Sequence, residues 1–185
     1  TNVTCMNKKL CQMYYYWHDD FSAVGLSLKN GSTMWFILPD EGKTTADILN
    51  EGSYGELISS GNTEDGWQNK KYMKVNLSVP KFDISSTLNL KDGLNRMGVT
   101  KVFDIKSSDF TAITSDTPVY VTAVNQSARV EIDENGVKAA AYIEFPSSGA
   151  AQPPEEIIDF VLDRPFVFVI SKGNLPLFTG VVNNI

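Results

Sequence analysis

The chain has 185 residues, of which 42% are hydrophobic and 21% are charged, and its formal net charge is −6. This supply of apolar and aromatic side chains excludes a disordered or fibrous chain and predicts one compact domain or a part of a larger one. The 22 acidic residues outnumber the 16 basic ones, and the basic residues form adjacent pairs only at Lys8-Lys9 and Lys70-Lys71. Because a nucleic-acid-binding surface needs clustered basic residues, we expect no nucleic-acid partner.

The apolar runs and the cysteines exclude two further classes. Runs such as residues 166–170 are far shorter than the roughly 20 residues that a transmembrane helix needs, so we expect no membrane span. Cys5 and Cys11 are too few to complete a four-ligand zinc site, and we favour two free thiols over one disulfide.

The N-terminal third predicts strands followed by a short helix. Aromatic and apolar residues alternate with polar ones over residues 13–38, which predicts two strands separated by the turn sequence Asn30-Gly31-Ser32. Residues 34–38 are all apolar and precede Pro39, a pattern typical of a strand buried on both faces. Residues 45–50 predict a short helix that ends near Gly52.

The middle of the chain mixes element types. Residues 52–66 are polar and rich in glycine, which predicts a loop or an irregular helix. Apolar residues alternate with polar ones over residues 75–79, which predicts a strand ending at Pro80. Residues 91–97 predict a small amphipathic helix, and residues 119–132, rich in β-branched residues, predict one long strand.

The C-terminal third predicts two strands, residues 166–170 and 177–182, joined by a turn at Gly173-Asn174. Strands outnumber helices along the chain, and the helices are short and scattered, so we predict a β-dominated α+β fold with mixed sheets. Residues 136–164 then form a connection too long for a compact domain unless it has a function. We place the activity there.

No enzymatic signature accompanies the titratable residues. His18 is the only histidine, and we interpret it as a surface residue at a strand end because no nucleophile motif accompanies it. The carboxylate pairs Asp19-Asp20, Asp133-Glu134 and Glu155-Glu156 are adjacent in sequence, so on strands their side chains would point to opposite faces. We interpret them as solvated charge and expect no enzyme activity, no cofactor and no bound metal.

Several stretches together point to a known family, and they follow the family's order along the chain. They are WFILPDE (35–41), VPKFDI (79–84), LNRMGV (94–99), DFTAI (109–113), EIDENGVKAAA (131–141), DRPFVFVI (163–170) and LFTGVV (177–182). The chain resembles the serpins along essentially its whole length. The resemblance implies that residues 1–185 are the C-terminal half of a serpin domain, with its reactive-centre loop at about 136–163. The N-terminal half is absent from this chain and would come from another chain or a cut precursor.

The resemblance implies a suicide inhibitor of serine proteases. Such a protein offers an exposed loop as a substrate and inserts the cleaved loop as a new sheet strand while the protease stays acylated. It also implies secretion to the extracellular space. The positions that match the family's hinge and insertion segment are Glu134, Gly136, Val137, Lys138, Ala139, Ala140, Ala141 and Ile143.

The residues of this segment suit insertion. Gly136 permits a backbone swing without a Cβ penalty. Strand alternation from there places Val137, Ala139, Ala141 and Ile143 on one face, with Lys138 and Ala140 on the other. An apolar inner face and a charged or amphipathic outer face are what a strand needs between a core and water.

The family's spacing from the hinge and the Pro153-Pro154 pair both place the reactive bond at Ala150-Ala151. A small residue before the bond fits the narrow pocket of an elastase-like protease. We therefore predict elastase-like or subtilisin-like serine proteases as targets, with cysteine proteases as a second class.

The chain departs from inhibitory serpins directly after the hinge glycine. Those usually carry Thr or Ser and then an acidic residue, whereas this chain has Val137 and Lys138. The alternative hypothesis is a non-inhibitory serpin that acts as a storage, carrier or chaperone-like protein. A third, an unrelated β-rich binding module, predicts no protease-sensitive bond near Ala150.

Overall fold

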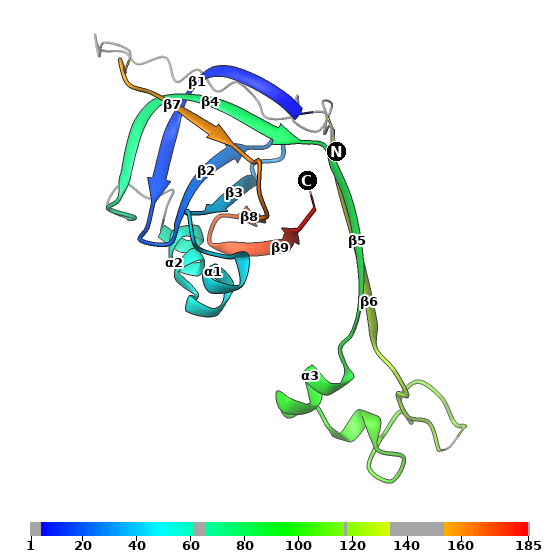
Figure 1. The fold of residues 1–185 in the computed structure, drawn as a ribbon. Helices are drawn as coiled ribbons and strands as arrows, with labels where there is room; N and C mark the ends of the chain where they lie inside the picture. Colours follow the sequence, from blue (N-terminus) through cyan, green and yellow to red (C-terminus); the bar gives the residue numbers. More distant parts are fainter. Residues whose placement is uncertain (1–4, 61–65, 117, 134–153, 185) are drawn as a thin grey trace. The chain divides into compact units, whose positions relative to one another are not determined.

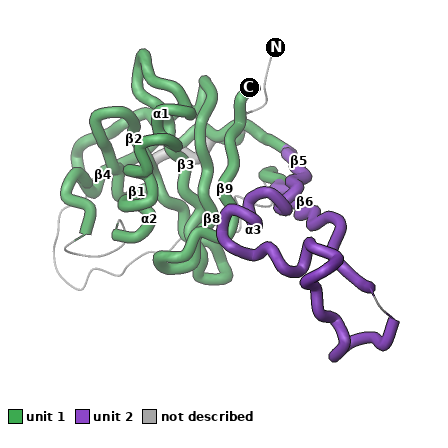
Figure 2. The backbone as a smooth tube through the Cα atoms, turned by 90° about the horizontal axis from the view of Figure 1, so that it is seen from below, with its two compact units in different colours: residues 1–82, 131–185 green, residues 83–130 purple. Residues whose placement is uncertain are grey.

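The computed structural model describes residues 5–60, 66–116, 118–133 and 154–184. The chain divides into two compact units, one of residues 1–82 and 131–185 and one of residues 83–130 (Figure 2). Among the described residues, no helix combines the length and the apolar character that crossing a bilayer would require.

The first unit is built on a seven-stranded sheet of order β7-β4-β1-β2-β3-β8-β9 (Figure 1). Its strands are β1 (Cys5–Trp17), β2 (Phe21–Ser27), β3 (Thr33–Pro39), β4 (Lys70–Pro80), β7 (Ile157–Val161), β8 (Phe166–Lys172) and β9 (Leu175–Val182). Neighbouring strands pair antiparallel except β4 and β7, which are parallel. The mixed sheet confirms the predicted β-dominated α+β class.

The centre of this sheet is buried on both faces, as the apolar run in β3 predicts. On one face, Trp35 and Ile37 pack with residues of β2 and β8 and with helices α1 (Thr45–Glu51) and α2 (Ser53–Ser60), which contribute Ile48 and Leu57. On the other face, aromatic rings form edge contacts, such as Phe36 with Phe166, whose centroids are 6.1 Å apart. Burial on both faces explains why the alternating pattern is absent from β3.

Helix α1 begins and ends as the sequence predicts. Thr44 and Asp47 form a capping box, in which the Thr44 hydroxyl accepts from the Asp47 amide while the Asp47 carboxylate accepts from the Thr44 amide. The C-cap, Gly52, has φ = 74°, a left-handed conformation in which a Cβ is disfavoured.

We expect the change Gly52→Ala to destabilise the protein by about 1 kcal/mol, because the methyl group has space around it but the backbone becomes strained. The matched control is Gly55→Ala in α2, where a Cβ also meets nothing within 4 Å and φ is not positive. That change should be neutral or stabilising by up to about 1 kcal/mol. Urea unfolding of both variants measures the difference, and equal effects would contradict the backbone explanation.

The second unit contains most of β5 (Phe82–Asn89) and β6 (Asn125–Ile132), together with α3 (Lys91–Arg96) and the 3-10 helix η1 (Lys101–Phe103). β5 and β6 form a two-stranded sheet. No residue of α3 is buried, and Met97 directly after it is 81% exposed. The apolar face of α3 is therefore only partly covered, with Leu94 half-buried.

Helix α2 lies within residues 52–66, where the sequence predicts a loop or an irregular helix. Three other predictions of local structure need correction. Residues 13–38 hold the second half of β1 as well as β2 and β3, so they belong to three strands rather than two. Strand β7 occupies part of the predicted connection at 136–164. The long strand predicted at 119–132 begins only at Asn125.

The shortened strand has a clear cause in its backbone hydrogen bonds. The amide of Val121 donates to the carbonyl of Val102 in η1, and the carbonyl of Val124 accepts from the amide of Leu90 before α3. These groups bond to helical and turn residues instead of a neighbouring strand. A high content of β-branched residues cannot distinguish pairing with a strand from bonding to helical or turn residues. It reflects the conformational preference of the side chains and not the identity of the hydrogen-bond partner.

Candidate functional site

All the residues predicted for the reactive bond, the hinge and the insertion segment lie at 134–153, outside the described residues. They are Glu134, Gly136, Val137, Lys138, Ala139, Ala140, Ala141, Ile143, Ala150 and Ala151. The structure describes the two strands that flank this segment, β6 before it and β7 after it.

The preceding strand, β6, is held to β5 by polar side chains. Arg129 makes a two-point contact with Asp83, with Nε 2.8 Å from Oδ1 and Nη2 2.7 Å from Oδ2. The guanidinium holds the pKa of the Asp83 carboxyl below its ordinary value. The hydroxyls of Thr87 and Ser127 lie 3.0 Å apart and form a second link. These contacts fix which residues of the two strands lie opposite each other.

One edge of β6 pairs with β5, and within the described residues this sheet has no third strand. Its side chains alternate in exposure, with Ala128, Val130 and Ile132 half-buried and the residues between them exposed. Such alternation is typical of a strand with one face toward a core and one toward water. A two-stranded sheet is marginal alone, so β6 is suited to accept a further strand.

The following strand, β7, is an edge strand of the seven-stranded sheet. The Lys74 amide donates to the Glu156 carbonyl at 3.0 Å, and the Leu162 amide donates to the Ser78 carbonyl at 3.0 Å, so β4 holds β7 at both ends. Phe160 is only 2% exposed and packs edge-on against Tyr15. The chain that leaves the undescribed segment is thus firmly anchored.

Polar contacts add to this anchoring on the exposed side of β7. The Asn76 side-chain amide donates to the Asp159 carboxylate at 2.7 Å, and Lys71 pairs with Glu156 at 2.6 Å. Lys71 and Glu156 are both more than half exposed, so their ion pair contributes little to stability. The exposure of Glu156 agrees with its predicted role as a solvated charge.

The motifs at 35–41 and 163–170 meet in space. β3 pairs antiparallel with β8, and Trp35 lies opposite Val169 in the register. The guanidinium of Arg164 donates from Nε to the carbonyl of Pro39 at 3.0 Å. These residues therefore build the sheet core and its end, and they do not form a reactive centre.

The predicted interpretation of Asp19-Asp20 as solvated charge is wrong for Asp20. Asp19 is exposed, whereas Asp20 is 5% exposed and its carboxylate pairs with Lys43. The Lys43 ammonium holds the pKa of Asp20 below its ordinary value. Since Lys43 lies in the turn between β3 and α1, far from Asp20 in sequence, no local pattern could predict this pairing.

His18 is also more enclosed than a surface strand-end residue. Its ring stacks on Phe21 with a centroid distance of 5.2 Å and lies 5.8 Å from the Trp67 ring. Cys11 carries a free thiol, in line with the preferred prediction for that cysteine.

Comparison with known proteins identifies the family. The family model described as Serpin (serine protease inhibitor) matches residues 1–185. The chain belongs to the serpin family. The description of that model names serine protease inhibition, so the predicted resemblance is confirmed and a protease is the kind of partner that the family implies.

Two relatives and one solved structure show how much of a serpin this chain represents. An α1-antitrypsin-like protein, GS55-MS, of Ictidomys tridecemlineatus is 35% identical over 157 residues, which are 83% of this chain and 35% of the relative. Alpha-1-antiproteinase 2 of Equus caballus is 34% identical over 161 residues, 85% of this chain and 35% of the relative. The structure of a serpin from Schistosoma haematobium matches with a TM-score of 0.74 and 27% identity, covering 98% of this chain and 47% of that one. This serpin chain therefore spans about a third of its curated relatives and about half of that solved structure.

Proposed function

We propose that this serpin, completed by an N-terminal half, traps serine proteases by inserting its cleaved reactive-centre loop as a strand beside β6. The observation that carries the proposal is the arrangement of the loop's two flanks. The loop leaves from β6, which pairs only with β5 among the described strands, and it returns into β7, which is anchored along β4. A cut between them frees the β6 end to move while the β7 end stays in place.

The physical drive for insertion is the completion of a sheet. Each inserted residue adds backbone hydrogen bonds and buries apolar surface that was exposed in the native protein. Inserting about 15 residues at roughly 3.3 Å each moves the acylated protease by about 50 Å. The native state must then have a higher free energy than the inserted state and be held there by a kinetic barrier.

The roles within the loop follow the predicted positions. Gly136 is the proposed hinge and Glu134 precedes it, while Val137, Ala139, Ala141 and Ile143 form the inward face of the inserted strand. Lys138 and Ala140 stay on the outward face. The proposed reactive bond is Ala150-Ala151, which favours elastase-like or subtilisin-like proteases, with cysteine proteases as a second class.

The proposed N-terminal half would cover surfaces that this chain leaves exposed. In the second unit, Met97 and Ile113 are 81% and 83% exposed, and Ile105 is 47% exposed. Large apolar side chains that are this exposed are typical of a surface that another part of a protein covers. A separate chain or a cut precursor would supply the cover, and by family resemblance the complete protein is proposed to act outside the cell.

Incubation of the complete protein with pancreatic elastase tests the proposal. We expect a covalent complex that survives SDS, a new terminus at Ala151, and a cleaved form that melts at a markedly higher temperature than the intact one. Elastase with its serine blocked should give no complex, because the trap needs an acyl bond.

The same experiment tests the alternative, a non-inhibitory serpin with a storage, carrier or chaperone-like role. Val137, Tyr142 and Pro146 favour this alternative. Val137 replaces the small polar residue usual in inhibitory serpins, Tyr142 is bulkier than usual, and Pro146 removes a backbone donor from any strand pairing it joins. Clean cleavage without complex formation and without a rise in melting temperature would support it and overturn the proposed trap.

A further inference from the structure

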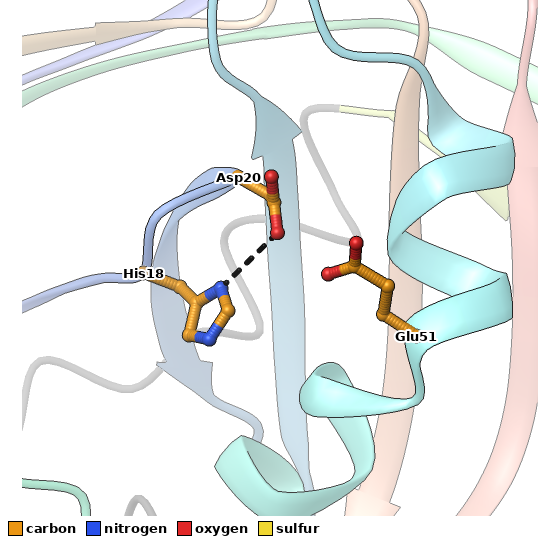
Figure 3. A group of neighbouring side chains, drawn as sticks. All are labelled: His18, Asp20 and Glu51. Carbon is orange, nitrogen blue, oxygen red and sulfur yellow. Dashed lines mark ion pairs between the residues drawn. The ribbon is translucent and has the colours of Figure 1, made fainter.

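Three side chains with metal-binding atoms meet beside the sheet in the first unit (Figure 3). His18 and Asp20 lie in the turn between β1 and β2, and Glu51 is the last residue of α1. One ring nitrogen of His18 and one carboxylate oxygen each of Asp20 and Glu51 all lie within 4.8 Å of one another. Figure 3 shows the three groups pointing toward a common space.

The backbone around these residues is well fixed. The His18 amide donates to the Phe21 carbonyl at 2.8 Å, and the Asp40 amide donates to the Asp20 carbonyl at 2.9 Å. The His18 ring stacks on Phe21 and lies tilted against Trp67. Ligands held in advance lose little conformational freedom when an ion binds.

The His18 ring nitrogen Nδ1 is a buried polar atom that has no hydrogen-bond partner in the described part of the chain. It lies 3.6 Å from Oδ2 of Asp20, which is too long for a good hydrogen bond. Two ligand atoms of a tetrahedral Zn²⁺ ion, each about 2.0 to 2.2 Å from the metal, are about 3.4 Å apart. The separation of Nδ1 and Oδ2 thus suits a shared ion better than a direct contact.

The two carboxylates of this cluster also favour a cation. Asp20 is 5% exposed and Glu51 is exposed, so the proposed ion would have one buried and one solvent-facing carboxylate ligand. Lys43 contacts Oδ1 of Asp20, while His18 lies beside Oδ2, so an ion at Oδ2 leaves the lysine contact in place.

We propose that His18, Asp20 and Glu51 bind one divalent transition-metal ion of the zinc type. One imidazole nitrogen and two carboxylate oxygens form a mixed nitrogen and oxygen donor set, which suits such ions better than Mg²⁺ or Ca²⁺, ions that prefer oxygen alone. Three protein ligands leave a fourth position for water. The bound ion links the turn between β1 and β2 to the end of α1.

Calorimetric titration of the complete protein with zinc chloride tests this site. We expect one Zn²⁺ per chain, bound at least tenfold more weakly by His18→Gln and by Glu51→Gln. The control is Asp19→Asn, which removes an exposed carboxylate from the same turn and should leave the affinity unchanged. Lys43→Met should bind Zn²⁺ at least as tightly as the parent, because it removes a positive charge beside the proposed ion.

A second measurement reports the geometry directly. Co²⁺ in place of Zn²⁺ should give a visible absorption band typical of four-coordinate cobalt, absent in His18→Gln, while circular dichroism confirms that the variant is folded. No heat of binding at millimolar zinc, or equal affinities in the parent and in both ligand variants, would overturn the proposal. Neither readout depends on protease inhibition. The proposed metal site can therefore fail while the proposed function holds, and the reverse is also true.

Discussion

In the complete protein, the change Ala139→Arg is expected to turn the proposed protease inhibitor into a protease substrate. Ala139 lies on the proposed inward face of the inserted strand, where arginine would place an unpaired charge in the sheet core. Leaving a buried charge without a partner costs about 3 kcal/mol or more, so the inserted state should be disfavoured about 100-fold or more relative to release of the protease. The measurement is the molar ratio of inhibitor consumed to elastase inhibited.

The matched control is Ala140→Arg, the same change at the next residue. Strand alternation places Ala140 on the outward face, where the guanidinium can stay in water. We expect this variant to inhibit elastase nearly as well as the parent. Equal loss of inhibition in both variants, or no loss in either, would contradict the proposed register of insertion.

The change Trp35→Ala is expected to destabilise the protein by about 3 to 5 kcal/mol, a large part of the stability of a domain. Trp35 is fully buried between the sheet and the two helices, and Tyr16 packs edge-on against its ring at 5.2 Å. Its indole nitrogen donates to the Ser171 hydroxyl at 3.1 Å. Denaturant unfolding of the complete protein, followed by circular dichroism, measures the loss.

Two further variants show how much of the loss in Trp35→Ala comes from burial of the ring and how much from its hydrogen bond. Trp17→Ala removes an indole that is 38% exposed and should cost much less than Trp35→Ala. Trp35→Phe keeps most of the ring volume but leaves the buried Ser171 hydroxyl without its donor, which should cost about 1 to 3 kcal/mol. If Trp17→Ala proves as costly as Trp35→Ala, the assignment of Trp35 to the core is wrong.

Local chemistry made several elements predictable. Helix α1 ends at Gly52 because only a residue without a Cβ adopts φ = 74° easily. The hairpin between β8 and β9 turns at Gly173, whose φ is 56°, for the same reason. In each case the determining interaction lies within a few residues, so the pattern is visible in the sequence.

Elements whose partners are distant in sequence were harder to predict. β7 exists because residues 157–161 pair with residues 74–78 of β4, and its short sequence has no strong pattern of its own. Residues 119–124 have strand-like composition, but Val121 bonds to Val102 in η1 and Val124 bonds to Leu90 before α3. In both, tertiary pairing overrides local preference.

For the candidate site, sequence determined the family through motifs that match serpins along the whole chain, and it placed the proposed hinge and reactive bond by their spacing. Those motifs can be recognised in the sequence because core packing restricts which residues can occupy β3 and β8. Only the tertiary structure brought His18, Asp20 and Glu51 together and buried Asp20 beside Lys43. The physical reason is that these contacts join a turn, a helix end and a loop that no periodicity relates, and folding of the sheet and helices alone determines their separation.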